Sequence, residues 1–315
     1  MPIPHLSAAD LDALALTAAE IRDALAATLR AQATGTVHAA PKTMLKPGDG
    51  RLLMTTLAAD DRAGVMAVKS LVQNPANRAR GLPYSDALVT ALDASSGRPI
   101  ATLDGGWITA HRTAALTMLA AHFLARDNAT TAGFLGAGVQ AQSHLAALVQ
   151  LYPLTHLRIH SRSAPDRLAG HARALGLSVE ITGSPRAAIA GADIVISAMS
   201  RDTPDTGGLD ASWLSPGSFA SLVDLGHTWA RAPLGRLDAL VLDDLAQERS
   251  LAADTRLAPL EVVAGDLADL VAGRLPPRQD PDQRFAFLFR GPASADLSLT
   301  ALALQKAGLV ASDPG

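Results

Sequence analysis

A glycine-rich turn in the middle of the chain has the residue spacing of a dinucleotide-binding loop. The apolar run 132–135 leads into Gly136-Ala-Gly138-Val-Gln-Ala141, and helix-forming residues follow. Gly136 permits a tight turn, Gly138 lets the backbone approach a pyrophosphate, and Ala141 is small enough for close packing of helix on strand. The free N–H groups at the start of such a helix bind phosphate. The pattern predicts a dinucleotide site that includes Gly136, Gly138, Val139 and Gln140, and a purely structural turn is the alternative.

The end of the next predicted strand bears on which dinucleotide is bound. An NAD site usually has an Asp or Glu about 20 residues past the glycines, where it binds the ribose 2′-hydroxyl. No acid occurs in 157–165, and Ser161-Arg162-Ser163 stands there instead. A guanidinium and two hydroxyls can all donate hydrogen bonds to a 2′-phosphate. The sequence therefore favours NADP(H) over NAD(H), and an exposed loop arginine is the alternative reading.

Three residues upstream of the glycine turn are candidates for a part in the chemistry. Lys69, one of only four lysines, ends an apolar run over 64–69 that is predicted to be a strand. A helix is predicted over 109–125 with Thr109 as its cap, which places Arg112 and Thr113 in its first turn. A cation there opposes the helix macrodipole, and an anion between the arginine and the helix end relieves this. A lysine that extends to solvent and a surface arginine are the alternatives.

Composition bounds the class of protein. Of the 315 residues 48% are hydrophobic and 3% aromatic, so the core is built from small aliphatic side chains. The net charge of −3 gives no basic surface for nucleic acid. The lack of Cys excludes disulfides and cysteine nucleophiles and fits a reducing cytoplasm. No signal peptide and no long apolar run occur, so we expect a cytoplasmic protein without a membrane span.

Two kinds of pattern divide the chain. Residues 7–34 predict one helix with Ser7 as N-cap. The β-prone runs that follow alternate with Pro, Gly and Asn turns, which predicts an antiparallel region. From 131 onward strands alternate with helices, which predicts a doubly wound parallel sheet, and a final helix is expected over 295–308. The predicted strands are 51–56, 64–69, 86–92 and 100–103 in the first region and 131–135, 157–160, 177–182, 193–198, 218–224 and 239–243 in the second; helices are predicted over 139–151, 165–175 and 185–191.

His156 and His160 have the spacing of a metal pair on a helix, but they fall on a predicted strand. Four residues of a strand separate side chains by about 13 Å. We therefore expect no metal site.

Four blocks of sequence resemble one family. They are 67–83 (AVKSLVQNPANRARGLP), 103–121 (LDGGWITAHRTAALTMLAA), 134–141 (FLGAGVQA) and 289–308 (FRGPASADLSLTALALQKAG). In residue type, order and spacing they resemble the ornithine cyclodeaminase / mu-crystallin family. The resemblance implies an α/β fold with a Rossmann-type domain over 126–292. It also implies a discontinuous α/β substrate and dimerisation domain, 1–125 completed by 293–315, that pairs into a homodimer.

The resemblance also implies roles for the candidate residues. Lys69 and Arg112 match positions that bind a substrate α-carboxylate near C4 of the nicotinamide, and the lysine is placed to help proton transfer at the substrate nitrogen. Thr113 matches a position that contacts the cofactor phosphates. Two cations that fix the carboxylate hold Cα in line for hydride transfer. Candidates for the pocket beyond Cα are Met54, Thr56, Trp229 and the loop at Gly291.

Two positions depart from the family pattern. A third carboxylate-binding cation, usually an arginine, is matched by Lys42, which binds an anion as a point charge but not bidentately. The family's amine-handling Asp is matched by Gly226, and Asp224 lies about two positions early. Asp224 either does that task from a shifted backbone or caps the turn after its strand. His227 is a second acid/base candidate or a surface-loop histidine.

The resemblance implies an NAD(P)-dependent oxidoreductase acting on the C–N bond of a small imino or amino acid. The leading expectation is reduction of a cyclic ketimine carboxylate such as Δ1-pyrroline-2-carboxylate, with Lys69, Arg112 and Asp224 as catalytic candidates. The alternatives are conversion of L-ornithine to L-proline and ammonia, alanine or opine-type dehydrogenation, and a non-catalytic protein that binds NADPH. The displaced Asp224 favours imine reduction, because cyclodeamination needs a carboxylate at the substrate amine.

Overall fold

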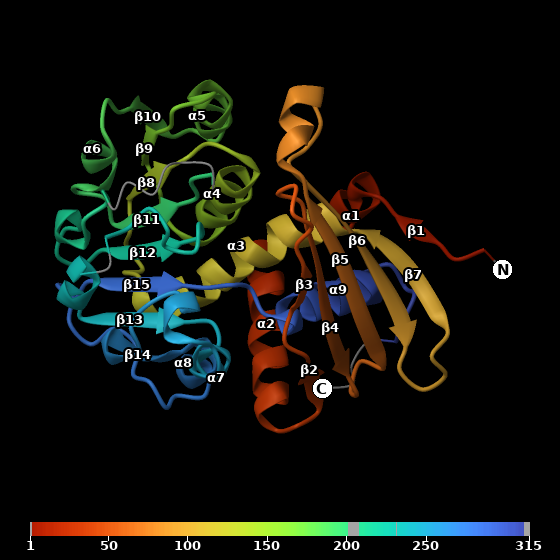
Figure 1. The fold of residues 1–315 in the computed structure, drawn as a ribbon. Helices are drawn as coiled ribbons and strands as arrows, with labels where there is room; N and C mark the ends of the chain where they lie inside the picture. The colour runs from red at the N-terminus through yellow and green to blue at the C-terminus, as the bar shows by residue number, and fades with distance from the viewer. Residues whose placement is uncertain (1, 201–207, 231, 312–315) are drawn as a thin grey trace. The chain divides into compact units, whose positions relative to one another are not determined.

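The structure, a computed structural model, describes residues 2–200, 208–230 and 232–311. The chain forms two compact units (Figure 1), one up to Thr113 and again from Gly291, and the other over Ala114–Arg290. The chain crosses between them twice, first within helix α3 (Gly105–Leu124) and then between residues 290 and 291. The domain limits expected from the sequence, 1–125 with 293–315 and 126–292, remain a prediction, and residues 312–315 lie outside the described part.

The first unit is built on a seven-stranded sheet in the order β1-β7-β6-β5-β4-β2, with β3 also beside β4. The pairs from β4 to β7 are antiparallel, which confirms the antiparallel region predicted from the turns. Helix α9 packs on β4 and β5, and α2 packs on α9. The strands are β1 (His5–Leu6), β2 (Val37–Ala39), β3 (Thr43–Leu45), β4 (Leu52–Asp60), β5 (Val65–Gln73), β6 (Ser85–Asp93) and β7 (Pro99–Asp104); the helices are α1 (Ala8–Ala13), α2 (Ala18–Ala33) and α9 (Ala293–Lys306), with a 3-10 turn at Pro75–Arg80.

Strand β5 carries Lys69 at its centre. The pattern 64–69 predicts a strand that ends at Lys69, but β5 runs on to Gln73, where Asn74-Pro75 stops it. Alternation along the strand buries Val65, Ala67, Lys69 and Leu71 on one face and exposes Ser70 and Val72 on the other. Lys69 therefore points into the core and does not extend to solvent.

The predicted helix over 7–34 is wrong, because the segment holds two helix starts. Ser7 caps α1 and forms a capping box with Asp10, as expected. Thr17 and Glu20 form a second capping box that begins α2, and Ala15 turns the chain between the helices with a φ of 50°. Each box satisfies backbone N–H groups that a continuous helix would use internally.

Helix α3 begins four residues earlier than predicted. The Asp104 carboxylate accepts a hydrogen bond from the N–H of Trp107 at 2.7 Å, so Asp104 and not Thr109 caps the start. Arg112 and Thr113 consequently lie more than one turn inside the helix, and their predicted place in its first turn is wrong. The macrodipole, which acts within the first turn, does not explain Arg112.

The second unit is an eight-stranded sheet in the order β10-β9-β8-β11-β12-β15-β13-β14, in which all described pairs are parallel. This confirms the doubly wound sheet. The strands β14 and β15 were not predicted, because each is a four-residue run without periodicity. The strands are β8 (Thr131–Leu135), β9 (His156–His160), β10 (Ser178–Ile181), β11 (Ile194–Ser197), β12 (Phe219–Leu222), β13 (Ala239–Leu242), β14 (Val263–Asp266) and β15 (Phe285–Leu288); the helices are α4 (Val139–Leu151), α5 (Pro165–Ala174), α6 (Pro185–Ile189), α7 (Leu245–Ser250) and α8 (Leu267–Val271).

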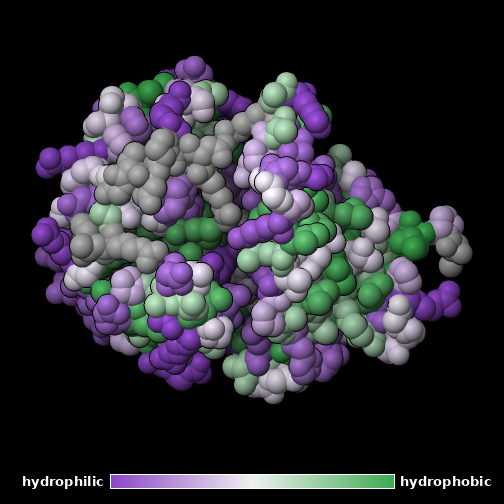
Figure 2. Space-filling model, in the orientation of Figure 1, coloured by the Kyte–Doolittle hydropathy of each residue, from purple (hydrophilic) through white to green (hydrophobic). Residues whose placement is uncertain are grey.

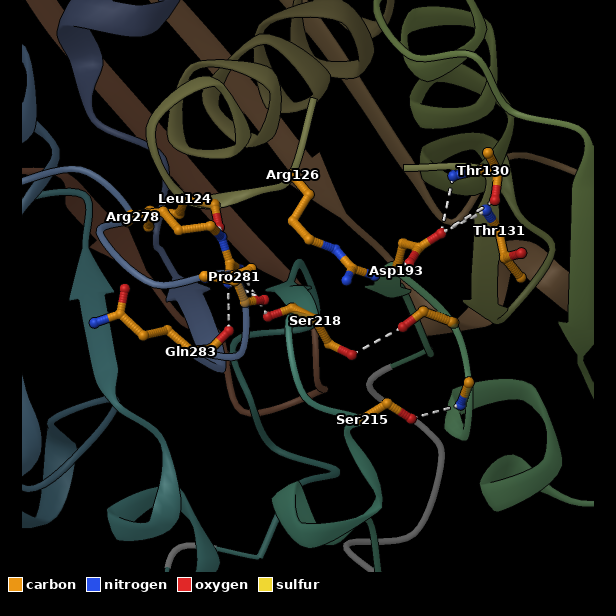
Figure 3. A network of polar contacts seen from close by, with 12 residues as sticks. Leu124, Arg126, Thr130, Thr131, Asp193, Ser215, Ser218, Arg278, Pro281 and Gln283 are labelled. Carbon is orange, nitrogen blue, oxygen red and sulfur yellow. Dashed lines mark hydrogen bonds and ion pairs between the residues drawn. The ribbon is translucent and has the colours of Figure 1, made fainter. Parts of the chain in front are cut away.

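A polar network holds the edge of this sheet where β8 and β11 begin (Figure 3). The Asp193 carboxylate pairs with Arg126 and accepts from the backbone N–H groups of Thr130 and Thr131 at 2.8 and 3.0 Å. Arg278 donates to the carbonyl of Leu124, the last residue of α3. The opposite edge, where the parallel strands end, carries the glycine turn.

No helix in the described ranges is both long and apolar enough to cross a membrane.

Candidate active site

A buried cluster of charges lies in the first unit, between the sheet and α9. Nζ of Lys69 is 2.6 Å from Oδ1 of Asp296, and Nε of Arg112 is 3.0 Å from the same oxygen. The hydroxyl of Thr56 donates to the other carboxylate oxygen, Oδ2, at 2.9 Å. The structure thus brings the predicted pair Lys69 and Arg112 together on one carboxylate.

Asp296 is a residue of this cluster that the sequence analysis did not predict. It stands in the first turn of α9, where an acidic residue is ordinary because it favours the helix dipole. The usable signal in the sequence was its neighbourhood, since Asp296 is the one charged residue in the run 293–304 (ASADLSLTALAL). The structure buries nearly all of this run. An acid among such residues needs a buried cation.

Burial and charge together set the protonation of the cluster. The pKa of Lys69 is lowered to about 8, chiefly because burial disfavours the charged amine; the charge of Asp296 opposes this shift and the charge of Arg112 adds to it. Burial by itself raises the pKa of Asp296, but Lys69 and Arg112 outweigh it and hold that pKa below its usual value. Lys42 acts in the same direction, so its charge also reaches the cluster. All three predicted carboxylate-binding cations therefore act on Asp296.

Arg112 keeps donors that nothing in the described chain uses. Nε and Nη1 are buried without a hydrogen-bond partner, and the contact of Nε with Asp296 is an ion pair by distance whose angle is not that of a hydrogen bond. Gly291 makes room for the guanidinium, because a Cβ at that position would lie 1.9 Å from Nη1. Unsatisfied guanidinium donors are suited to a carboxylate.

The glycine turn in the second unit has an open helix start. Gly136 has a φ of 96°, and a Cβ there would lie 2.5 Å from the carbonyl oxygen of Ala198. Gly138 is the N-cap of α4 without a side-chain cap, and a Cβ on it would meet no atom within 4 Å. Val139 is exposed, and the side-chain oxygen of Gln140 is buried without a partner. This leaves the first N–H groups of α4 available to an anion.

The other cofactor candidates are placed as follows. Ser161, Arg162 and Ser163 come directly after β9, and the Ser161 hydroxyl donates to the carbonyl of Ser163 at 2.8 Å. Arg162 and Ser163 are exposed. The buried hydroxyl of Thr113 donates to the carbonyl of Thr109 at 2.5 Å and keeps its lone pairs.

Asp224 caps the turn after β12. Its carboxylate accepts from the hydroxyls of Ser197 and Thr228 at 2.6 and 2.9 Å and from the N–H of Gly226 at 3.2 Å. Burial raises its pKa against the effect of these donors. Nδ1 of His227 lies 2.5 Å from the carbonyl oxygen of Asp224. These contacts are those of the capping alternative, and a catalytic part for Asp224 or His227 remains a prediction.

The pocket candidates belong to both units. Thr56 belongs to the charge cluster, Met54 is half-buried on β4, and Trp229 is buried in the second unit with its indole N–H unpaired. Over the ranges that the structure covers, no three His, Asp or Glu side chains are grouped as metal ligands.

Comparison with known proteins identifies the family of the chain. The model of the Ornithine cyclodeaminase/mu-crystallin family matches residues 6–307. The Delta(1)-pyrroline-2-carboxylate/Delta(1)-piperideine-2-carboxylate reductase of Azospirillum brasilense is 28% identical over 321 residues, which cover 100% of this chain and 98% of that protein.

Two solved structures share the fold. One is the Thermococcus litoralis Delta(1)-pyrroline-2-carboxylate reductase in complex with NADH and L-proline, with a TM-score of 0.88 and 23% identity over 98% of this chain and 100% of that chain. The other is an archaeal alanine dehydrogenase dimer with bound NAD, with a TM-score of 0.85 and 22% identity over 98% of this chain and 96% of that one. The chain belongs to the ornithine cyclodeaminase/mu-crystallin family.

Proposed function

We propose that the protein is an NAD(P)H-dependent oxidoreductase that reduces a cyclic ketimine carboxylate, such as Δ1-pyrroline-2-carboxylate, to the amino acid. The observation that carries this proposal is the cluster in which Lys69 and Arg112 share one carboxylate, Asp296. Two cations and one anion leave one positive charge, and Arg112 has buried donors to spare. A monocarboxylate supplies the missing negative charge and the missing acceptors. The Azospirillum relative, matched over 98% of its length, supports the same substrate class.

Each residue of the site has a separate role in the proposed reaction. Arg112 and Lys69 hold the substrate carboxylate, which fixes the position of Cα. Lys42 adds a third attraction for the carboxylate as a point charge. A bound dinucleotide supplies the hydride that Cα receives. Lys69, with its pKa lowered to about 8, releases its proton to the imine nitrogen near neutral pH.

The dinucleotide is proposed to bind at the open start of α4, against Gly136, Gly138, Val139 and Gln140, with Thr113 contributing to its phosphates. Ser161, Arg162 and Ser163 are proposed to bind a 2′-phosphate, which makes NADP(H) the preferred cofactor. No Asp or Glu stands at this strand end to bind a free 2′-hydroxyl.

A homodimer is proposed to form through the outer face of the first unit's sheet, which is the face opposite α9. The strand register places Leu45, Leu53 and Val72 in one row, and Leu57 and Leu88 lie on the same face. All five side chains are exposed, and Figure 2 shows apolar surface gathered over these strands. Exposed apolar faces of this kind are covered in an assembly, and a second copy presents the same face by symmetry.

The test is oxidation of NADPH, followed at 340 nm, on addition of Δ1-pyrroline-2-carboxylate. We expect turnover by the parent protein and at least about a hundredfold loss in Lys69→Ala and in Arg112→Ala, because each interaction acts on the reacting molecule. The exposed Lys46→Ala is the control. Steady release of proline and ammonia from L-ornithine, with no imine reduction, would overturn the proposal in favour of cyclodeamination.

A further inference from the structure

Asp296 has three partners within the first unit and none of them is water-exposed. Lys69 comes from β5, Arg112 from α3 and Thr56 from β4, and each is less than a tenth exposed. Asp296 itself comes from the far end of the chain, 227 residues after Lys69. Two strands and two helices therefore meet at one carboxylate.

The two carboxylate oxygens of Asp296 have different partners. Oδ1 faces both cations, at 2.6 and 3.0 Å, while Oδ2 is held by the Thr56 hydroxyl at 2.9 Å. The hydroxyl fixes the rotation of the carboxylate, so Oδ1 cannot turn away from the cations. Without this negative charge, Lys69 and Arg112 would be two like charges buried side by side, and the lysine would lose its proton.

From this geometry, and resting on the proposed function, we infer that Asp296 is the positioning residue of the reaction: it keeps Lys69 protonated and directed, beside Arg112, toward the substrate. Asp296 does not touch the substrate. It is the shared counter-ion that lets two cations remain buried and leaves one positive charge for the substrate carboxylate. Lys69 then gives up its proton to the imine nitrogen and regains one from solvent.

The test uses the small number of lysines. The chain has four, Lys42, Lys46, Lys69 and Lys306, so protein labelled with 13C at the lysine Cε gives four signals whose pH titrations are separable. Loss of one signal in Lys69→Arg assigns Lys69. This readout requires neither substrate nor turnover.

Two substitutions should move the pKa of Lys69 in opposite directions. Asp296→Asn keeps the shape but removes the negative charge, so the pKa of Lys69 should fall by at least about one unit, a tenfold change in its proton affinity. Arg112→Gln removes a positive charge, so the pKa of Lys69 should rise. Glu20→Gln is the matched control, because Glu20 pairs with exposed Lys306 at 2.7 Å and should leave Lys69 unchanged.

Kinetics then link the shift to the reaction. In Asp296→Asn the basic limb of the kcat/KM profile for imine reduction should move to lower pH by the same amount, while the Kd for NADPH stays within about twofold. An unchanged pKa of Lys69 in Asp296→Asn overturns the inference, and if that variant does not fold, an unchanged or lower pKa in Arg112→Gln does so. A parent protein that shows the NMR shifts but reduces no imine would refute the proposed function alone.

Discussion

The guanidinium of Arg112 occupies space that only a glycine at position 291 leaves open. A Cβ on Gly291 would lie 1.9 Å from Nη1 and 2.7 Å from Cζ of Arg112. Gly291 also has a φ of 84°, which side chains other than glycine rarely adopt. The position of the Arg112 side chain therefore depends on a glycine in the loop before α9.

Gly291→Ala should displace Arg112 and lower kcat/KM for the imine by about 10- to 100-fold, as expected for a misplaced substrate contact. Gly308→Ala is the control, because Gly308 has a similar φ of 70° but nothing within 4 Å of an added Cβ. Both variants carry the same backbone strain, of about 1 kcal/mol. Equal losses of activity in the two variants would show that strain, and not the contact with Arg112, is responsible.

Arg162→Glu should weaken NADPH binding by about 10- to 100-fold and change NADH binding little. A lost charge-assisted hydrogen bond costs about 1.5–3 kcal/mol, and only NADPH has the 2′-phosphate that makes it. Fluorescence titration with both cofactors measures the effect, and Arg167→Glu, an exposed site on α5, controls for the change of net charge. Equal affinity of the parent protein for NADH and NADPH would refute the preference.

Stability should decrease in mild acid because of His144. This residue is fully buried, with Nε2 3.0 Å from the Thr117 hydroxyl and Nδ1 2.7 Å from the carbonyl of Gln140. Burial lowers its pKa from 6.5 to about 4. Between these values the unfolded chain binds a proton at this residue and the folded chain does not, so the free energy of unfolding falls as the pH falls, by about 3 kcal/mol in all.

Denaturant unfolding at several pH values between 7 and 4 measures this slope. His144→Gln should reduce it, whereas His156→Gln, at an exposed site, should not. A slope that persists in full in His144→Gln would assign the acid sensitivity to other groups.

Leu57→Asp should convert a dimer into monomers. Leu57 is 45% exposed on the outer face of the sheet, and a buried carboxylate in a dimer interface would lack a partner. Leu175→Asp is the control, since Leu175 is similarly exposed, at 43%, but lies in the second unit. Sedimentation velocity distinguishes the two species, and a parent protein that sediments as a monomer would refute the proposed interface.

Features that depend on neighbours along the chain were predictable from the sequence. The alternation of short apolar runs with helices predicted the parallel sheet, and the helix after the glycine turn has the predicted limits, Val139–Leu151. The left-handed φ of Gly136 follows from the same short motif. Such features are local, because turn chemistry and periodicity act over a few residues.

Contacts between residues far apart in the sequence were not predictable, because they form only in the folded chain. Lys69 and Arg112 were predictable as cations, but their common carboxylate comes from a helix 227 residues after Lys69, and nothing in local periodicity pairs those segments. The position of β15 between β12 and β13 is likewise a pairing of strands that are not consecutive in the sequence. Both outcomes follow from burial, since a buried charge requires a counter-ion and a buried strand requires paired neighbours, whichever part of the chain provides them.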